Sequence, residues 1–192
     1  MRIASGMKKS KSRRLKRVDS AMPTCTCVSI ASQLRAEGTE AAQRIRYMPG
    51  GATLVATMRK HGAYCALVSG GFTFFTRYVA AELGMDFVRS NELEIADGAL
   101  TGRVVMQDWG DICDGEQKRL MLLQCCEAIG CRPDQAIAVG DGANDLPMMQ
   151  ACADAGGLSV AYHAKPKVRE QAMVSIEMGG LDRLLEVLAP GL

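Results

Sequence analysis

The pattern of hydrophobic and polar positions predicts helices and buried strands in alternation. Apolar residues at helical spacing indicate helices, and short continuous apolar runs indicate strands that are covered on both faces. The predicted helices span residues 52–61, 73–83, 116–129, 145–152 and 180–188. The predicted strands span residues 64–68, 87–95, 100–105, 136–139, 158–161 and 174–176. This alternation is typical of a three-layer, Rossmann-like α/β fold with a mainly parallel sheet.

Two of the predicted strands are expected to form a separate hairpin. Asp97-Gly98 lies between the strands at 87–95 and 100–105. The Asp-Gly pair is a strong signal for a tight β-turn, because both residues tolerate a positive φ. We therefore expect a small antiparallel hairpin beside the parallel sheet.

The composition fits one folded domain without a membrane span. The chain has 192 residues, of which 48% are apolar, and this is enough for a hydrophobic core. The longest apolar runs, such as residues 64–68, are far shorter than the roughly 20 residues that cross a bilayer. The basic start is not followed by the apolar segment of a secretory signal. We therefore expect a cytoplasmic protein that does not bind membranes.

The eight cysteines are expected to be reduced thiols. Four disulfides are disfavoured, since Cys125 and Cys126 are adjacent in a helical pattern and Cys65 lies in a strand pattern. A zinc site is disfavoured too, because neither the cysteines nor the two histidines have the usual ligand spacing.

The charge is unevenly distributed along the chain. Residues 1–20 carry eight Lys/Arg and one acid, whereas the other 172 residues carry 15 basic and 20 acidic side chains. The basic segment is open to four interpretations: a solvated disordered tail, a transit-like peptide, a non-native start, or a nucleic-acid patch, which the absence of interleaved aromatics disfavours. We expect residues 1–46 to be disordered or non-native and residues 47–192 to form the folded core.

Two predicted strands end in glycine turns that carry polar residues. Ser69-Gly70-Gly71 offers a hydroxyl and bare backbone N–H groups to an anion, although glycines often serve turn shape alone. The second turn runs from Gly140 to Asp145 and holds Asp141, Asn144 and Asp145. Carboxylates in this arrangement suit Mg²⁺, whereas an Asx turn with a helix cap explains only part of the pattern. Both turns are expected at the same edge of the sheet, where α/β folds bind ligands.

Lys118 lies near the start of a predicted helix. A lysine there opposes the helix dipole, so it gains nothing locally and a phosphate partner becomes more plausible. A solvated surface lysine is the alternative.

Together these motifs resemble the haloacid dehalogenase superfamily, and within it the phosphoserine phosphatase branch. The resemblance covers about residues 47–190 and rests on Val68-Ser69-Gly70-Gly71-Phe72-Thr73, on Asp97-Gly98 with Thr101-Gly102, on Lys118, on Gly140-Asp141-Gly142-Ala143-Asn144-Asp145-Leu146 and on His163-Ala164-Lys165-Pro166.

The resemblance implies Mg²⁺-dependent hydrolysis of O-phospho-L-serine to L-serine and phosphate, the last step of serine biosynthesis. It implies that Ser69, the Gly70 amide and Asn144 bind the phosphate group or the substrate. It also implies that Lys118 neutralises phosphate charge, that Asp141 ligates Mg²⁺, and that Asp145 orients metal-bound water or Lys118.

The first motif of the family, Asp-x-Asp-x-Thr/Val, does not occur in this sequence. The nearest string contains Asp19, but Arg17 stands in the position of the nucleophile, which is therefore unassigned. Residues 25–30 favour a strand and are a candidate substitute for the central strand, although Ala31-Ser32-Gln33 offers no carboxylate.

We interpret the chain as a phosphatase body joined to an unrelated start, short of most of the helical cap that selects substrates in the family. Without the motif we expect weaker Mg²⁺ binding and, without its strand, two exposed sheet edges. A non-catalytic remnant that binds phosphate weakly and a nucleic-acid-binding protein are the alternatives. No pattern in the sequence indicates an oligomeric state.

Overall fold

A computed structural model describes residues 25–29, 45–97 and 99–188 of the chain. Its main feature is a six-stranded parallel sheet in the order β3-β2-β1-β6-β7-β8. The strands are β1 (Cys25–Ser29), β2 (Tyr64–Phe72), β3 (Phe87–Asn91), β6 (Ala136–Gly140), β7 (Leu158–Tyr162) and β8 (Val174–Ile176). The three-layer α/β architecture predicted from the sequence is therefore confirmed.

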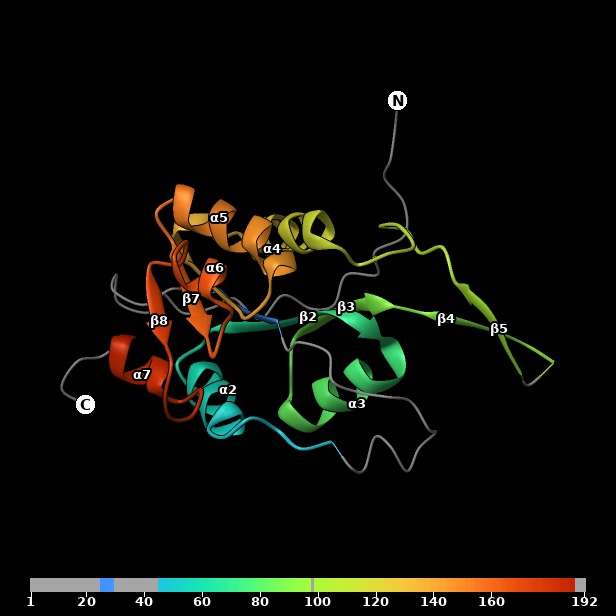
Figure 1. The fold of residues 1–192 in the computed structure, drawn as a ribbon, viewed down its shortest axis with the longest axis horizontal. Coiled ribbons are helices and arrows are strands. Elements are labelled where there is room, and N and C mark those ends of the chain that lie inside the picture. Colours follow the sequence, from blue (N-terminus) through green and yellow to red (C-terminus); the bar gives the residue numbers. More distant parts are fainter. Residues whose placement is uncertain (1–24, 30–44, 98, 189–192) are drawn as a thin grey trace.

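Helices cover both faces of the sheet (Figure 1). One face is covered by α4 (Gly115–Ile129), α5 (Leu146–Asp154) and α6 (Pro166–Arg169), and the other by α2 (Gly51–Lys60), α3 (Thr73–Leu83) and α7 (Arg183–Leu188). Two short 3₁₀ turns, η1 (Pro133–Gln135) and η2 (Ala143–Asp145), flank β6. Each face has its own apolar cluster, because the central strands are apolar on both sides.

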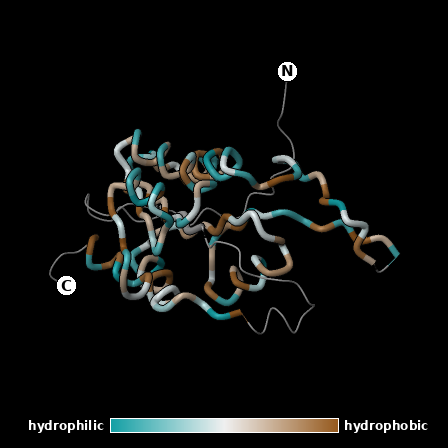
Figure 2. Tube along the Cα trace, viewed as in Figure 1, coloured by the Kyte–Doolittle hydropathy of each residue, from teal (hydrophilic) through white to brown (hydrophobic). Residues whose placement is uncertain are grey.

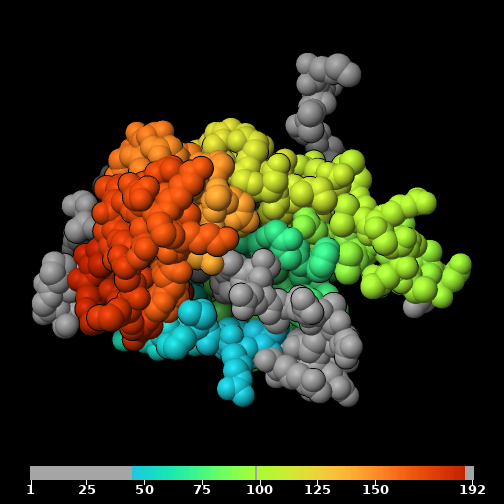
Figure 3. Space-filling model, viewed as in Figure 1, coloured from blue at the N-terminus to red at the C-terminus, as the bar shows by residue number. Residues whose placement is uncertain are grey.

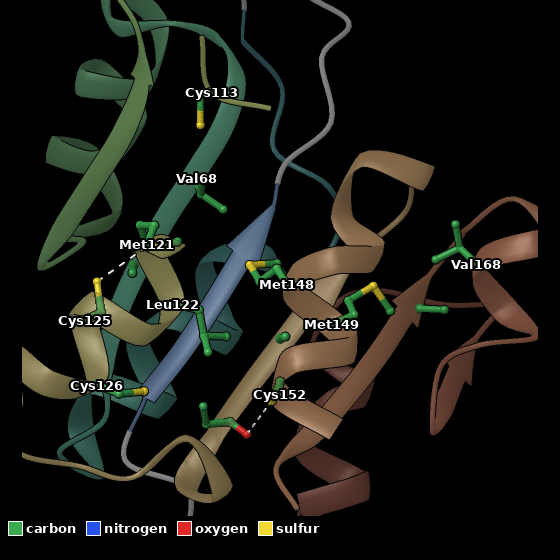
Figure 4. Packing of buried hydrophobic residues seen from close by; sticks show 14 residues of the cluster. Val68, Cys113, Met121, Leu122, Cys125, Cys126, Met148, Met149, Cys152 and Val168 are labelled. Atoms are coloured by element: carbon green, nitrogen blue, oxygen red, sulfur yellow. Dashed lines mark hydrogen bonds between the residues drawn. The ribbon is translucent and has the colours of Figure 1, made fainter. Parts of the chain in front are cut away.

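The cluster under α4 and α5 is rich in sulfur (Figure 4). The thiol of Cys125 donates to the sulfur of Met121 at 3.5 Å, and that of Cys152 donates to the Ala136 carbonyl at 3.3 Å. Cys65, Cys113, Cys125 and Cys152 are buried free thiols, as the sequence predicted. The helix that carries Lys118 and the helix that directly follows Asp145 therefore rest on a packed layer.

Residues 25–29 occupy the centre of the sheet. Cys25 pairs with Tyr64 of β2 on one side and with Ala136 of β6 on the other. The predicted substitute strand is thus confirmed, and the expected exposure of two inner sheet edges is wrong, because β1 pairs with both neighbours. The sheet also takes this strand from the segment that we expected to lie outside the core.

The predicted strand over residues 87–95 is wrong as a single element. It divides at Glu92, because β3 pairs with β2 in the main sheet whereas β4 (Leu93–Ala96) pairs with β5 (Ala99–Val104). The β4–β5 hairpin was predicted, and it projects beyond the helical layers (Figure 3). It carries hydrophobic positions on its exposed length, including Ile95 and Leu100 (Figure 2).

Two element boundaries differ from the prediction by three residues or more. β2 continues through the glycines to Phe72, which pairs with Asn91 after a shift in register. The last helix begins at Arg183 rather than 180, since the Leu181 N–H bonds to the Pro49 carbonyl instead of extending the helix.

None of the helices in the described ranges is long and apolar enough to span a bilayer.

Candidate active site

The two glycine segments lie at the same edge of the sheet, on either side of β1. Ser69, Gly70 and Gly71, called the Ser69 turn below, belong to the last residues of β2, so the predicted end of this strand before the glycines is wrong. Ser29 at the end of β1 is level with Val68, the residue before Ser69. Val28 is level with Val139, which precedes Gly140 at the end of β6. Parallel strands place their carboxyl ends at one edge. Ser69 near the end of β2 and Asp141 directly after β6 therefore belong to strands that are separated only by β1.

Lys118 and Asp145 form an ion pair in the interior of the site. The Nζ of Lys118 lies 2.6 Å from Oδ1 of Asp145, and the two side chains are 2% and 0% exposed. A buried lysine needs such a partner, because the desolvation of an unpaired charge costs several kcal/mol. Lys118 is therefore not the solvated surface lysine that was the alternative.

The other carboxylate oxygen of Asp145 holds the turn after β6 in shape. Oδ2 accepts hydrogen bonds from the backbone N–H groups of Asp141 and Gly142, both at 3.0 Å. A Cβ atom on Gly140 would lie 2.4 Å from the Cβ of Asp145, so the close approach requires glycine at that position. Asp145 thus links the lysine to the loop that presents Asp141.

Asp141 has the properties of a cation ligand. Its Oδ1 atom is buried and has no hydrogen-bond partner among the residues that the structure describes. Burial raises the pKa of its carboxyl, the carboxylate of Asp145 raises it further, and Lys118 acts in the opposite direction. A divalent cation bound to Oδ1 would offset both the burial of this carboxylate and its repulsion by Asp145.

The fit to a cation is that of a partly open site. Within the described ranges, no group of three or more His, Cys, Asp or Glu side chains gathers around one point. Mg²⁺ binds with only one or two carboxylates when water and substrate phosphate oxygens complete its shell. The described residues therefore fit a cation such as Mg²⁺, whose shell water and substrate oxygens can complete.

The Ser69 turn is shaped by its own hydroxyl. The Oγ of Ser69 accepts a hydrogen bond from the Gly71 N–H at 3.0 Å. Since the oxygen is already an acceptor, the hydroxyl proton can point away from Gly71 toward an anion. Gly70 is exposed, which leaves its backbone accessible.

The segment after β7 is also attached to this site. The N–H of Lys165 donates to the Asp141 carbonyl at 3.2 Å. His163 in the same segment adopts a positive φ of 45°. Residues 163–166, which form part of the sequence resemblance, therefore adjoin the Asp141 turn in the structure.

Asn144 does not cap the helix that follows it. Residues Ala143–Asp145 form η2, and the N-cap position of α5 belongs to Asp145 without a side-chain hydrogen bond. Pro147 in the first turn of α5 lacks the N–H that a cap would bind. The side chain of Asn144 is exposed at the turn, close to Gly142.

Sequence reasoning missed Asn91. This residue is 6% exposed, and its side chain connects the Ser69 turn to the segment before α4. The strand that ends in Asn91 also carries the polar residues Arg89 and Ser90, so no pattern in the sequence singled out Asn91. Asp19, the basic segment at 1–20 and Ala31-Ser32-Gln33 lie outside the described residues, and so the nucleophile has no position in the structure.

Comparisons with known proteins agree on one family. The family model for haloacid dehalogenase-like hydrolases matches residues 2–150. A phosphoserine phosphatase of Polaromonas sp. strain JS666 is 63% identical over 145 residues, which cover 76% of this chain and 60% of that protein. One of Albidiferax ferrireducens is 60% identical over 148 residues, 77% of this chain and 61% of that protein.

A solved structure adds the fold. A phosphoserine phosphatase in its apo form is 33% identical with a TM-score of 0.69, over 77% of this chain and 70% of that one. The chain spans about three fifths of the length of the curated relatives above. With the sheet, the paired Lys118 and Asp145, and these matches, the chain belongs to the haloacid dehalogenase-like hydrolases.

Proposed function

We propose that this protein is a phosphoserine phosphatase that hydrolyses O-phospho-L-serine to L-serine and phosphate with the help of Mg²⁺. The observation that carries the proposal is the buried ion pair of Lys118 and Asp145 between the Ser69 turn and the Asp141 turn. The substrate class is taken from the relatives, which bear that name.

The phosphate group would bind at the carboxyl edge of the sheet. The Ser69 hydroxyl would donate to a phosphate oxygen, because its Oγ already accepts from Gly71. The N–H of the exposed Gly70 would donate to another. Lys118 would supply positive charge from the buried side of the site, and its contact with Asp145 fixes the direction of its side chain. Asn144, exposed at the neighbouring turn, is placed to bind the substrate.

The residues for the cation are those of the second turn. Asp141 would hold Mg²⁺ through Oδ1, with Asp145 fixing the backbone around it. When bound, Mg²⁺ supplies charge that offsets the charge on the phosphoryl oxygens during transfer. The carboxylate that accepts the phosphoryl group in this family has no counterpart among the described residues.

A measurement of phosphate release from O-phospho-L-serine tests the proposal. The natural chain and Asp141→Asn are compared with and without Mg²⁺, and p-nitrophenyl phosphate serves as a second substrate. Release that needs Mg²⁺ and is lost in the variant supports the proposal. Release at the level of the variant contradicts turnover by this chain.

One observation favours a second candidate function. The sequence lacks an Asp-x-Asp pair, so a protein that binds phosphate without turning it over is the alternative. Calorimetric titration with inorganic phosphate, combined with the release assay, separates the two functions. A protein that only binds phosphate should show binding in the titration and no release of phosphate from O-phospho-L-serine.

A further inference from the structure

Asn91 at the end of β3 joins two segments that come together at the site. Its Nδ2 donates to the Gly70 carbonyl at 2.8 Å, and its Oδ1 accepts from the Cys113 N–H at 2.6 Å. The whole residue is 6% exposed, so water cannot readily replace either bond. A single amide thus uses one donor and one acceptor to hold two backbones.

Each of the two backbones leads to a residue of the proposed phosphate site. Gly70 follows Ser69 directly. Cys113 precedes Asp114, whose Oδ1 caps α4 by accepting from the Gln117 N–H at 2.9 Å and whose carbonyl accepts from the Lys118 N–H at 3.0 Å. The position of the first turn of α4, and with it Lys118, is therefore tied to the Ser69 turn through Asn91.

The two segments are close enough for this link to fix their spacing. A Cβ atom on Gly70 would lie 3.5 Å from the Cys113 carbonyl oxygen. Within this contact the amide of asparagine fits both partners, whereas a carboxylate would accept from Cys113 but repel the Gly70 carbonyl.

We propose that Asn91 is a positioning residue that sets the Ser69-Gly70 turn relative to Lys118 and thereby raises the affinity of the site for a phosphate group. The inference rests on the proposed function, because it assumes that these residues bind phosphate. Asn91 itself does not contact the phosphate, and it acts by keeping the donors in the binding geometry before the ligand arrives.

The neighbouring Ser90 provides a matched control. It is 2% exposed, and its hydroxyl lies 2.6 Å from the Thr76 hydroxyl, so it is a buried polar residue on the same strand. Its side-chain bond does not involve the Gly70 or Cys113 backbone. Ser90→Ala therefore removes a buried hydrogen bond while leaving the link between the two segments intact.

The first experiment measures the dissociation constant of inorganic phosphate by calorimetric titration in the presence of Mg²⁺. Asn91→Asp keeps the acceptor for Cys113 and loses the donor for Gly70. We expect it to raise the constant about tenfold, the effect of one ordinary hydrogen bond, and Ser90→Ala to change it less than twofold. Equal effects of the two variants, or none from Asn91→Asp, would overturn the inference.

The second experiment needs no ligand and separates this inference from the proposed function. Amide hydrogen exchange is measured by NMR for Gly71 and Cys113 in the natural chain and both variants. We expect Gly71 to exchange at least tenfold faster in Asn91→Asp only, with Cys113 unchanged. If the natural chain binds no phosphate, the proposed function fails. Unchanged exchange of the Gly71 amide in Asn91→Asp would contradict the positioning role, whatever the result of the phosphate titration.

A third measurement avoids substitution in case Asn91→Asp does not fold. The side-chain amide signal of Asn91 in the natural chain is followed during titration with inorganic phosphate. It is expected to shift, because its N–H contacts the Gly70 carbonyl. The amide of Gln124, which accepts from Arg89 at 2.8 Å, serves as the control and should not shift. A stationary Asn91 signal while the Gly71 amide shifts contradicts the inference.

Discussion

The Nζ of Lys118 and the Oδ1 of Asp145 lie 2.6 Å apart in the interior, although the residues are separated by 27 positions in sequence. Lys118 belongs to α4 and Asp145 to η2, and a Cβ atom on Gly115 would come within 3.1 Å of the Asn144 carbonyl. The two elements can meet this closely because α4 begins with glycine. The ion pair therefore fixes the relative positions of the lysine and the Asp141 turn.

Replacement of Lys118 by methionine is expected to destabilise the protein strongly. The Asp145 carboxylate would stay buried without its cation, which typically costs about 3–5 kcal/mol of the free energy of unfolding. Urea unfolding measures the loss. Arg119→Met is the control, since the ion pair of Arg119 with Glu116 is exposed and its removal should matter little. Similar effects of the two variants would contradict the assignment of Lys118 to the buried pair.

Replacement of Asp141 by asparagine is expected to have opposite effects with and without Mg²⁺. Without the cation the variant should unfold at a higher temperature, because the natural carboxylate is partly buried beside Asp145. With millimolar Mg²⁺ the natural chain should gain stability and the variant should not. Thermal unfolding at several Mg²⁺ concentrations gives the unfolding temperature of each protein without Mg²⁺ and its change when Mg²⁺ is added. Equal stabilisation of the two proteins by Mg²⁺ would remove Asp141 from the cation site.

Gly140→Ala is expected to disrupt the site at its base. The added Cβ would lie 2.4 Å from the Cβ of Asp145, so the side chain that pairs with Lys118 must move. Overpacking of this kind costs about 1–3 kcal/mol. Gly51→Ala is the matched control, because nothing lies within 4 Å of its Cβ position. Urea unfolding should distinguish the two, and a neutral Gly140→Ala would show that the turn can adapt.

The buried thiol of Cys65 predicts a loss of stability at alkaline pH. Burial raises the pKa of this thiol from 9.0 to about 12, and Asp86 contributes in the same direction. Between these values the unfolded chain loses the thiol proton while the folded chain keeps it, so stability falls as pH rises from about 9 toward 12. The difference between the natural chain and Cys65→Ala in urea unfolding isolates this slope, which should be smaller in the variant.

A carboxylate placed after β1 is expected to increase turnover. Ser29 is level with Val68, the residue before Ser69, and the residue after Ser29 in the sequence is Ile30. Position 30 itself lies outside the described residues. If the proposed activity is limited by the unassigned nucleophile, Ile30→Asp should raise Mg²⁺-dependent release of phosphate from O-phospho-L-serine at least tenfold over the natural chain. Ile30→Asn has a similar shape and no carboxylate, and an equal rate for both would reject this interpretation.

The parts of the fold that follow from local patterns could be predicted from the sequence. The helix at 73–83 has the predicted bounds, and the strand at 136–139 extends by one residue. The division of residues 87–95 at Glu92 could not be read in this way, because it depends on which distant strand each half pairs with. The central place of β1 depends on long-range pairing for the same reason, although its strand tendency was visible.

In the candidate site, too, the sequence indicated residues with a local signal and missed one whose contacts are long-range. Ser69, Lys118, Asp141 and Asp145 stood out as polar residues beside glycines or at a helix start, and the structure places them at one edge of the sheet or beneath it. Their roles in binding and catalysis remain predictions. Asn91 did not stand out, because its importance comes from two backbone partners that are remote in sequence.

The central position of β1 has a consequence for how the chain folds. The β2–β3 pair and the β6–β7–β8 group can each form from neighbouring strand–helix–strand units, which are fast because their contacts are local. They become one sheet only when Thr26 pairs with both Cys65 and Ile137. We therefore expect the insertion of these five residues to be the slow, committing event of folding, so that the edge of the sheet where Ser69 and Asp141 meet is assembled last.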